Sequence, residues 1–159
     1  MAERVIFHVD ANSAFLSWSA AYRVKVLGEE TDLREVPSVV AGDKASRHSI
    51  ILAKSVPAKK YGIQTGEPLF QALEKCPGLV VIPPDYELYV QASRHFVDML
   101  REFSPAVEQY SIDEAWVDMT GTQRLWGTPR LAAELMRRRI NEELGFTVNL
   151  GISSNKLLA

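Results

Sequence analysis

The stretch Ser104–Gly121, SPAVEQYSIDEAWVDMTG, decides the fold because it places a short polar turn between two β-prone runs. It predicts a strand, a tight turn and a second strand. Within it, Asp113 and Glu114 stand side by side, although adjacent like charges repel each other and strand interiors rarely carry Asp. Such a pair is typical of a solvated turn or of a cation site, and spacing alone leaves both interpretations open.

The rest of the chain predicts the element order β-α-β-β-α-α-β-α-β-β-α-β. A short strand over Val5–Val9 ends at Asp10, and Asn12 or Ser13 is expected to cap the helix that follows. Asp85–Phe103 is the most regular helix, and Thr128–Leu144 is predicted to be another. The chain ends in a short segment that begins a helix. This order predicts an α+β fold, a βαββαβ-type, mostly antiparallel sheet with helices on one face and a small insert.

Composition limits the possible classes. The 159 residues suffice for one domain, and a net charge of −2 argues against a general electrostatic grip on nucleic acid. Cys76 is the single cysteine, which excludes an internal disulfide and favours a reducing compartment. We expect no membrane span and no signal peptide, because a strand pattern starts directly after the first residues. A cytoplasmic location follows.

Asp10, Asp113 and Glu114 converge at one sheet end if the strands that carry them are neighbours. Three carboxylates at close range cannot all stay ionised without a cation, since like charges raise each other's pKa. Magnesium suits such a site, because it binds carboxylates together with substrate phosphates. Two such ions can clamp both oxygens of an in-line phosphoryl displacement.

A cationic stretch points to an anionic partner. Between residues 44 and 66 there is no Asp or Glu, but there are five basic residues: Lys44, Arg47, Lys54, Lys59 and Lys60. A triphosphate or a nucleic-acid backbone would suit them, and a solvated face is the alternative. Lys156 follows the last predicted strand where a helix begins, a common place to bind phosphate.

Four segments together resemble a known family: HVDANSAFLSW, AKSVPAKKYGIQTGEPLF, DYELYVQASRHFVDMLREFSPAVEQYSIDEAWVDMTG and VNLGISSNKLLA. They are similar to the Y-family lesion-bypass DNA polymerases, the ImpB/MucB/SamB and UmuC-like group, in order and over nearly the whole chain. The resemblance implies template-directed DNA synthesis across damaged template, in DNA repair and SOS-type damage tolerance. It also implies a two-metal mechanism with Mg²⁺, for which Mn²⁺ can substitute.

The resemblance assigns roles to individual residues. Asp10 and Asp113 match the metal-binding aspartates, Glu114 matches the third carboxylate, and the backbone carbonyl of Ala11 is a further expected metal ligand. The nucleotide-binding residues that it implies are Phe15, the steric gate against the ribose 2′-hydroxyl, and the phosphate-binding Lys59 and Lys156. Ser111 belongs to the signature and is expected to shape the turn.

Two departures from the family pattern concern the triphosphate. Val56 stands where the family commonly has a Tyr hydroxyl, and Lys59 replaces a more usual Arg, which loses a bidentate fork. Both predict a weaker or different grip on the triphosphate. Trp116, where the family often has Phe or Tyr, is expected in the core. His8, His48 and His95 show no metal-ligand spacing and are expected to be structural or exposed.

The family also predicts the domain organisation. Residues 1–37 and 83–159 correspond to the palm and residues 38–82 to a fingers insert, while the thumb and little finger are absent from this chain. We therefore expect a catalytic fragment that binds DNA feebly and extends primers poorly. The implied partners are primer–template DNA and deoxynucleoside triphosphates, with a sliding clamp engaged through regions absent here.

Two rival hypotheses remain. Palm-type nucleotide cyclases share the βαββαβ core with paired acids, but they carry paired glycines before the acids, where this chain has Tyr110-Ser111-Ile112. A degenerate palm that serves as a binding module is the other rival. The presence of all three carboxylates argues against it, and Val56 argues weakly for it.

Overall fold

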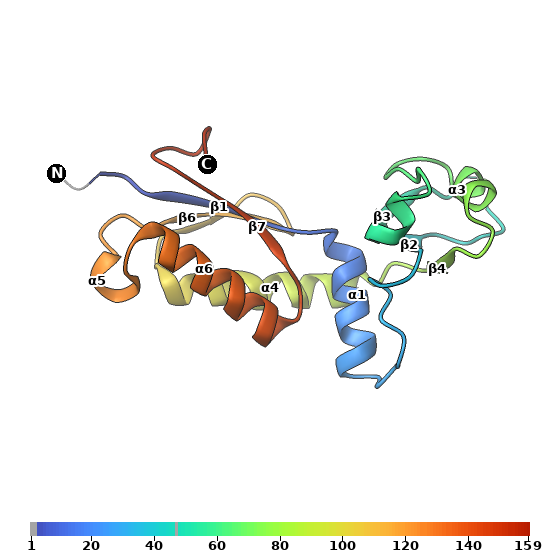
Figure 1. The fold of residues 1–159 in the computed structure, drawn as a ribbon, viewed down its shortest axis with the longest axis horizontal. Helices are drawn as coiled ribbons and strands as arrows, with labels where there is room; N and C mark the ends of the chain where they lie inside the picture. The colour runs from blue at the N-terminus through green and yellow to red at the C-terminus, as the bar shows by residue number, and fades with distance from the viewer. Residues whose placement is uncertain (1–2, 47) are drawn as a thin grey trace. The chain divides into compact units, whose positions relative to one another are not determined.

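The computed structural model describes residues 3–46 and 48–159, and they form two compact units. The first contains the described residues up to Asn12 together with Tyr89–Ala159, and the second is Ser13–Leu88. Each unit has a sheet with helices of its own, so the predicted α+β class is confirmed (Figure 1). The first helix groups with the second unit, whereas residues 1–37 were predicted to belong with the palm; the functional division stays a prediction.

The first unit contains a four-stranded sheet. Its strands are β1 (Ile6–Ala11), β5 (Val107–Gln109), β6 (Glu114–Asp118) and β7 (Val148–Ser153). Their spatial order is β5-β6-β1-β7, and every neighbouring pair is antiparallel. The chain therefore places β1 between two strands that lie more than a hundred residues later in the sequence.

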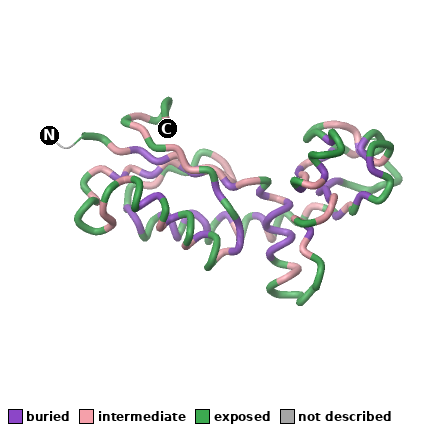
Figure 2. The backbone as a smooth tube through the Cα atoms, in the orientation of Figure 1, coloured by how far each residue is buried: buried purple, intermediate pink, exposed green. Residues whose placement is uncertain are grey.

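Helices α4 (Tyr86–Phe103) and α6 (Pro129–Arg139) lie along one face of this sheet (Figure 1). Phe7 and Val9 of β1 point to that face and are fully buried. Because side chains alternate along a strand, His8 and Asp10 point to the opposite face, where they are half-buried. The buried stripes of both helices are visible as purple segments (Figure 2). One face of the sheet thus forms the core, and the other is left open.

The helix ends follow from local sequence. Asp85 Oδ1 accepts a hydrogen bond from Leu88 N at 3.1 Å at the start of α4, as its capping role predicts. At the start of α6, Thr128 Oγ1 accepts one from Leu131 N. The predicted helix over 128–144 is present, but its last turn widens into a π-helix, η1 (Ile140–Leu144), that stops at Gly145 with φ 84°. A short helix, α5 (Gln123–Trp126), was not predicted.

The second unit is built on a three-stranded sheet. Helix α1 (Ala14–Lys25) precedes β2 (Ser38–Ala41) and β3 (Ile51–Lys54); α2 (Val56–Lys59), α3 (Leu69–Lys75) and β4 (Val80–Ile82) follow. The order is β3-β2-β4, with β2 antiparallel to β3 and parallel to β4. This mixed sheet lies within the range predicted for the insert.

Two apolar clusters cover the two faces of this smaller sheet. Val39 and Ile51 pack with residues of α2 and α3, whereas Val40 and Ala53 pack with Leu16 of α1. Ile51 and Ala53 are two residues apart, so they would share a face in a regular strand. The register shifts between Val40 and Ala41, and this bulge sends them to opposite faces.

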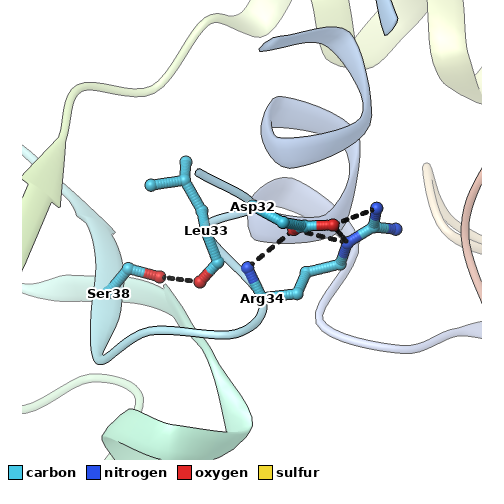
Figure 3. A network of polar contacts seen from close by, with 4 residues as sticks. All are labelled: Asp32, Leu33, Arg34 and Ser38. Atoms are coloured by element: carbon cyan, nitrogen blue, oxygen red, sulfur yellow. Dashed lines mark hydrogen bonds and ion pairs between the residues drawn. The ribbon is translucent and has the colours of Figure 1, made fainter. Parts of the chain in front are cut away.

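The loop before β2 is held by a compact polar network (Figure 3). Arg34 donates to the Asp32 carboxylate from its backbone N and from Nε, both at 2.9 Å to Oδ1, and from Nη2 at 2.8 Å to Oδ2. The side-chain hydrogen bonds from Arg34 lower the pKa of Asp32, although partial burial opposes the shift. The fully buried Ser38 donates from Oγ to Leu33 O at 2.5 Å. The loop therefore enters β2 in a fixed conformation.

One of the two caps predicted for α1 needs correction. Ser13 occupies the N-cap of α1, but its φ of 44° is left-handed and its side chain makes no capping hydrogen bond. The Asn12 amide donates to Thr147 Oγ1 at 3.0 Å, which ties the end of β1 to the start of β7. At the other end of the chain, the predicted first turn of a helix is present: Asn155 Oδ1 accepts a hydrogen bond from Leu158 N at 3.0 Å, and Asn155 O accepts one from Ala159 N at 3.2 Å.

Candidate active site

The candidate site lies where β1 ends and β6 begins. Asp10 is the register partner of Glu114 in the antiparallel ladder. Asp113 is the residue directly before β6, and its backbone O accepts a hydrogen bond from Ala11 N at 2.9 Å. The structure therefore brings Asp10, Asp113 and Glu114, with the backbone of Ala11, together at one end of the two inner strands of the sheet, although their roles stay predictions.

Asp10 and Glu114 share the open face of the sheet. Their neighbours Val9, Ala11 and Ala115 are buried on the helix side, so alternation turns both carboxylates away from the core. Both residues are half-buried, and so is Asp113 in the turn. As direct cross-strand partners, Asp10 and Glu114 form the like-charged arrangement that destabilises an antiparallel pair.

The electrostatics of the site reflect this crowding. Burial raises the pKa of Asp10, and the charges of Glu114 and Asp113 raise it further, while His8 opposes them. His8 Nε2 lies 3.4 Å from Glu114 Oε1. Within residues 3–46 and 48–159, no group of three or more His, Cys, Asp or Glu side chains is already arranged as a metal site. The three carboxylates thus lie together at one end of the sheet and repel one another there.

Lys156 lies on the same open face but is engaged elsewhere. Its Nζ forms an ion pair with the carboxylate of Glu108 and stands 5.3 Å from the centre of the Trp116 ring. Glu108 is the register partner of Trp116, so strand β5 presents its carboxylate beside that ring. A groove of about 400 Å³ runs along these three residues, and Arg4 and Asp118 also line it.

Trp116 is not a core residue, and this prediction was wrong. Ala115 and Val117 take the buried positions of β6, which leaves Trp116 half-buried on the open face. Its ring centre is 5.4 Å from that of His8 and 5.0 Å from that of Tyr110. His8, whose register partner is Trp116, therefore belongs to the surroundings of the carboxylates, whereas His48 and His95 are exposed.

The remaining predicted residues lie in the second unit. Phe15 is half-buried near the start of α1 and packs against the α1-side cluster, with its ring 6.0 Å from that of Tyr86 in an edge-on contact. Lys59 is exposed at the last residue of α2. Val56, the first residue of that helix, is 68% exposed. Of the cationic stretch, Lys44 and Lys60 are exposed, and Arg47 lies outside the described residues.

Comparison with known proteins decides the family. The model of the impB/mucB/samB family matches residues 9–159. The chain belongs to the impB/mucB/samB family. This membership confirms the resemblance found in the sequence. The matched residues include parts of both units of the chain.

Curated relatives of the impB/mucB/samB chain agree with the family model. A protein of Clostridium acetobutylicum named DNA polymerase IV is 53% identical over 156 residues, which are 98% of this chain and 39% of that protein. One of Bacillus subtilis named DNA polymerase IV 2 is 38% identical over 159 residues, 100% of this chain and 37% of that protein. The chain thus spans well under half the length of these relatives.

Solved structures show the same fold. A crystal structure of DinB from Sulfolobus solfataricus has a TM-score of 0.79 and 24% identity, over 98% of this chain and 43% of that one. An insertion ternary complex of Dbh DNA polymerase has a TM-score of 0.80 and 23% identity, over 98% of this chain and 44% of that one.

None of the described helices could cross a membrane; the longest, α4, carries charged residues such as Arg94 and Asp98.

Proposed function

We propose that this chain is the palm and fingers part of a Y-family DNA polymerase that performs template-directed nucleotidyl transfer across damaged template. The supporting observation is the pairing of Asp10 with Glu114, with Asp113 beside them, on an open sheet face of a chain from this family. The curated relatives are named DNA polymerase IV, which supports the same activity. Repair and SOS-type damage tolerance in the cytoplasm is the biological setting that we propose.

The donor set fits a pair of Mg²⁺ ions, with Mn²⁺ as a substitute. Carboxylate and carbonyl oxygens are the ligands that hard divalent cations prefer. Burial raises the pKa of Asp10, the charges of Glu114 and Asp113 raise it further, and a bound cation would favour the ionised carboxylate against both effects. Ala11 donates its N–H toward Asp113, and in an antiparallel ladder the C=O of a residue points to the same neighbouring strand as its N–H. Asp10, Asp113, Glu114 and the Ala11 carbonyl are therefore the proposed ligands.

The reaction that we assign is attack of the primer 3′-hydroxyl on the α-phosphate of a deoxynucleoside triphosphate, with release of pyrophosphate. The bound cations supply Lewis-acid stabilisation of the attacking and leaving oxygens. Lys59 and Lys156 neutralise the triphosphate, and the Phe15 ring excludes a ribose 2′-hydroxyl by its bulk. Val56 offers no hydroxyl, so the fingers contribute less to phosphate binding than in family members with Tyr there.

Lys156 must change partner to perform this role. Its ammonium group is paired with Glu108, and about half of each side chain is exposed, at 46% and 61%. An exposed ion pair contributes roughly 0–1 kcal/mol, so a triphosphate can displace the Glu108 carboxylate at little cost. The ion pair with Glu108 keeps Lys156 on the open face of the sheet, which also carries Glu114.

The remaining parts of the proposal concern the rest of the polymerase. We assign residues 1–37 and 83–159 to the palm and 38–82 to the fingers. The relatives are more than twice as long, so a thumb and little finger that hold the duplex, and any sliding-clamp contact, lie outside the matched part. Primer–template DNA and deoxynucleoside triphosphates are the proposed partners; the neighbouring ternary complex of a DNA polymerase is consistent with both.

Replacing both Asp113 and Glu114 with Ala in the full-length protein tests the proposal. Single-nucleotide incorporation on a primer–template should fall by about a thousandfold, because the candidate metal ligands at the start of β6 and in the turn before it are both lost. Asp98→Ala, an exposed carboxylate on α4, is the matched control and should keep the wild-type rate. Incorporation at the wild-type rate by the double variant would show that the site is not catalytic.

Of the two rival hypotheses, only the degenerate binding module has an observation in its favour, the absence of a hydroxyl at Val56, and that observation is weak. The family match weighs against a nucleotide cyclase. The presence of all three carboxylates at one end of the sheet weighs against a degenerate binding module.

A further inference from the structure

The turn that carries Asp113 is fixed by its own peptide carbonyls. Three successive carbonyls accept hydrogen bonds from three different elements. Gln109 Nε2 donates to Ser111 O at 3.0 Å, and Ser93 Oγ donates to Ile112 O at 2.5 Å. Ala11 N donates to Asp113 O at 2.9 Å. The turn is thus attached to β5, to α4 and to β1 at consecutive residues.

Ser93 and Gln109 form a relay beneath the turn. Ser93 is buried on α4, with 4% of its surface exposed, and its hydroxyl carries a single proton. It uses that proton for Ile112 O and accepts a second hydrogen bond from Gln109 Nε2 at 3.0 Å. The Gln109 amide therefore donates to both Ser93 and Ser111.

Ser111 lies between the two acidic side chains of the turn. Its Oγ is 2.8 Å from Asp113 Oδ1 and 3.1 Å from Glu114 Oε2. The single hydroxyl proton can form a full hydrogen bond to only one of these carboxylates at a time, although both lie within hydrogen-bond distance of Oγ. The hydroxyl thus draws together two groups of like charge that would otherwise separate.

We propose that Ser111, Ser93 and Gln109 are positioning residues that hold Asp113 and Glu114 in place for a divalent cation before it binds. Two carboxylates held near a common point lose little conformational freedom when a cation binds. The free-energy cost of their mutual repulsion is already present in the metal-free state, so a cation binds more tightly. Partners that orient metal ligands typically change affinity about 10–100-fold when they are removed. This inference rests on the proposed function, because it assumes that the two carboxylates bind metal.

Terbium(III) luminescence tests the proposal with a readout that does not depend on catalysis. Tb³⁺ takes hard oxygen ligands, and Trp116, which shares the open face with Glu114, can sensitise its emission. In the full-length protein, Ser93→Ala, Gln109→Met and Ser111→Ala should each weaken Tb³⁺ binding about tenfold. Ser111→Thr keeps the hydroxyl and should restore affinity, and Gln91→Met, at an exposed glutamine on α4, should change nothing.

A steady-state measurement separates positioning from a general loss of structure. The Mg²⁺ concentration for half-maximal incorporation should rise about tenfold in the three variants, while kcat at saturating Mg²⁺ returns close to the wild-type value. A variant that merely misfolds loses kcat at every Mg²⁺ concentration, and this result would overturn the positioning role.

Tb³⁺ binding by the double variant distinguishes a wrong positioning role from a wrong metal site. If the three variants bind Tb³⁺ with wild-type affinity while Asp113→Ala/Glu114→Ala abolishes binding, the metal site stands and the positioning role is wrong. If the double variant also binds Tb³⁺ like the wild type, the cation does not use these carboxylates. Both the inference and the proposed function then fall.

Discussion

Replacing Asp10 with Asn should stabilise the metal-free protein while it removes a candidate metal ligand. Asn has nearly the same shape as Asp but no charge, so it ends the repulsion with Glu114 across the β1–β6 ladder. Directly opposite side chains in such a ladder lie about 5 Å apart. At that separation the repulsion is about 3 kcal/mol at an effective dielectric constant of ~20 and below about 1 kcal/mol in bulk water.

The half-buried setting of Asp10 places the effect near the lower end of this range. We expect about 1 kcal/mol of added stability at pH 7, which raises the melting temperature by about 2–4 °C in a chain of this size. Thermal unfolding in the presence of a chelator measures it. Asp98→Asn, at an exposed α4 carboxylate, should stay within about 0.5 kcal/mol of the wild type.

The stability difference between Asp10→Asn and the wild type should depend on pH in a defined direction. In the folded protein the pKa of Asp10 is raised, so the ionised form is disfavoured by folding. The cost is therefore absent below the ordinary Asp pKa of about 3.9 and develops as pH rises through and above it. The advantage of Asp10→Asn should vanish in acid and be full at neutral pH. A variant that is equally or less stable than the wild type at pH 7 would refute the repulsion between these strands.

Two further predictions concern the surroundings of the site. Asp32→Asn should destabilise the second unit in urea unfolding at pH 7. The lowered pKa of Asp32 makes that difference largest above the ordinary Asp pKa and removes it as pH falls, so a constant difference down to pH 2 would contradict this reasoning. Glu108→Gln removes the ion pair of Lys156, so KM for the triphosphate should fall up to about fivefold while kcat stays at the wild-type value. An unchanged or higher KM would argue against displacement of the Glu108 carboxylate by the triphosphate.

Much of the first unit follows from β-prone runs and helical patterns. Val5–Val9 is a short apolar, β-rich run, and β-prone runs stand on either side of the polar turn Tyr110–Asp113, which is enough to predict β1, β5 and β6. Their antiparallel pairing then brings Asp10 and Glu114 together. The Asp85 cap and the Pro105 stop likewise predict α4 to within a residue.

What the sequence could not predict depends on contacts between distant residues. The Gln109–Ser93–Ile112 relay and the Lys156–Glu108 pair join side chains that no local pattern connects. Trp116 was assigned to the core by its chemistry, but Ala115 and Val117 decide which face of β6 is buried. The left-handed Ser13 and the π-turn at Ile140–Leu144 are backbone irregularities without a composition signal.

The most direct test of the account is anomalous diffraction from crystals of the full-length protein soaked with Mn²⁺ and a non-hydrolysable deoxynucleoside triphosphate. The account predicts two manganese peaks about 3.5–4 Å apart. Both should lie within coordination distance of the carboxylates of Asp10, Asp113 and Glu114, with the Ala11 carbonyl on one of them. Manganese bound at other residues, with these carboxylates turned away from it, would contradict the account.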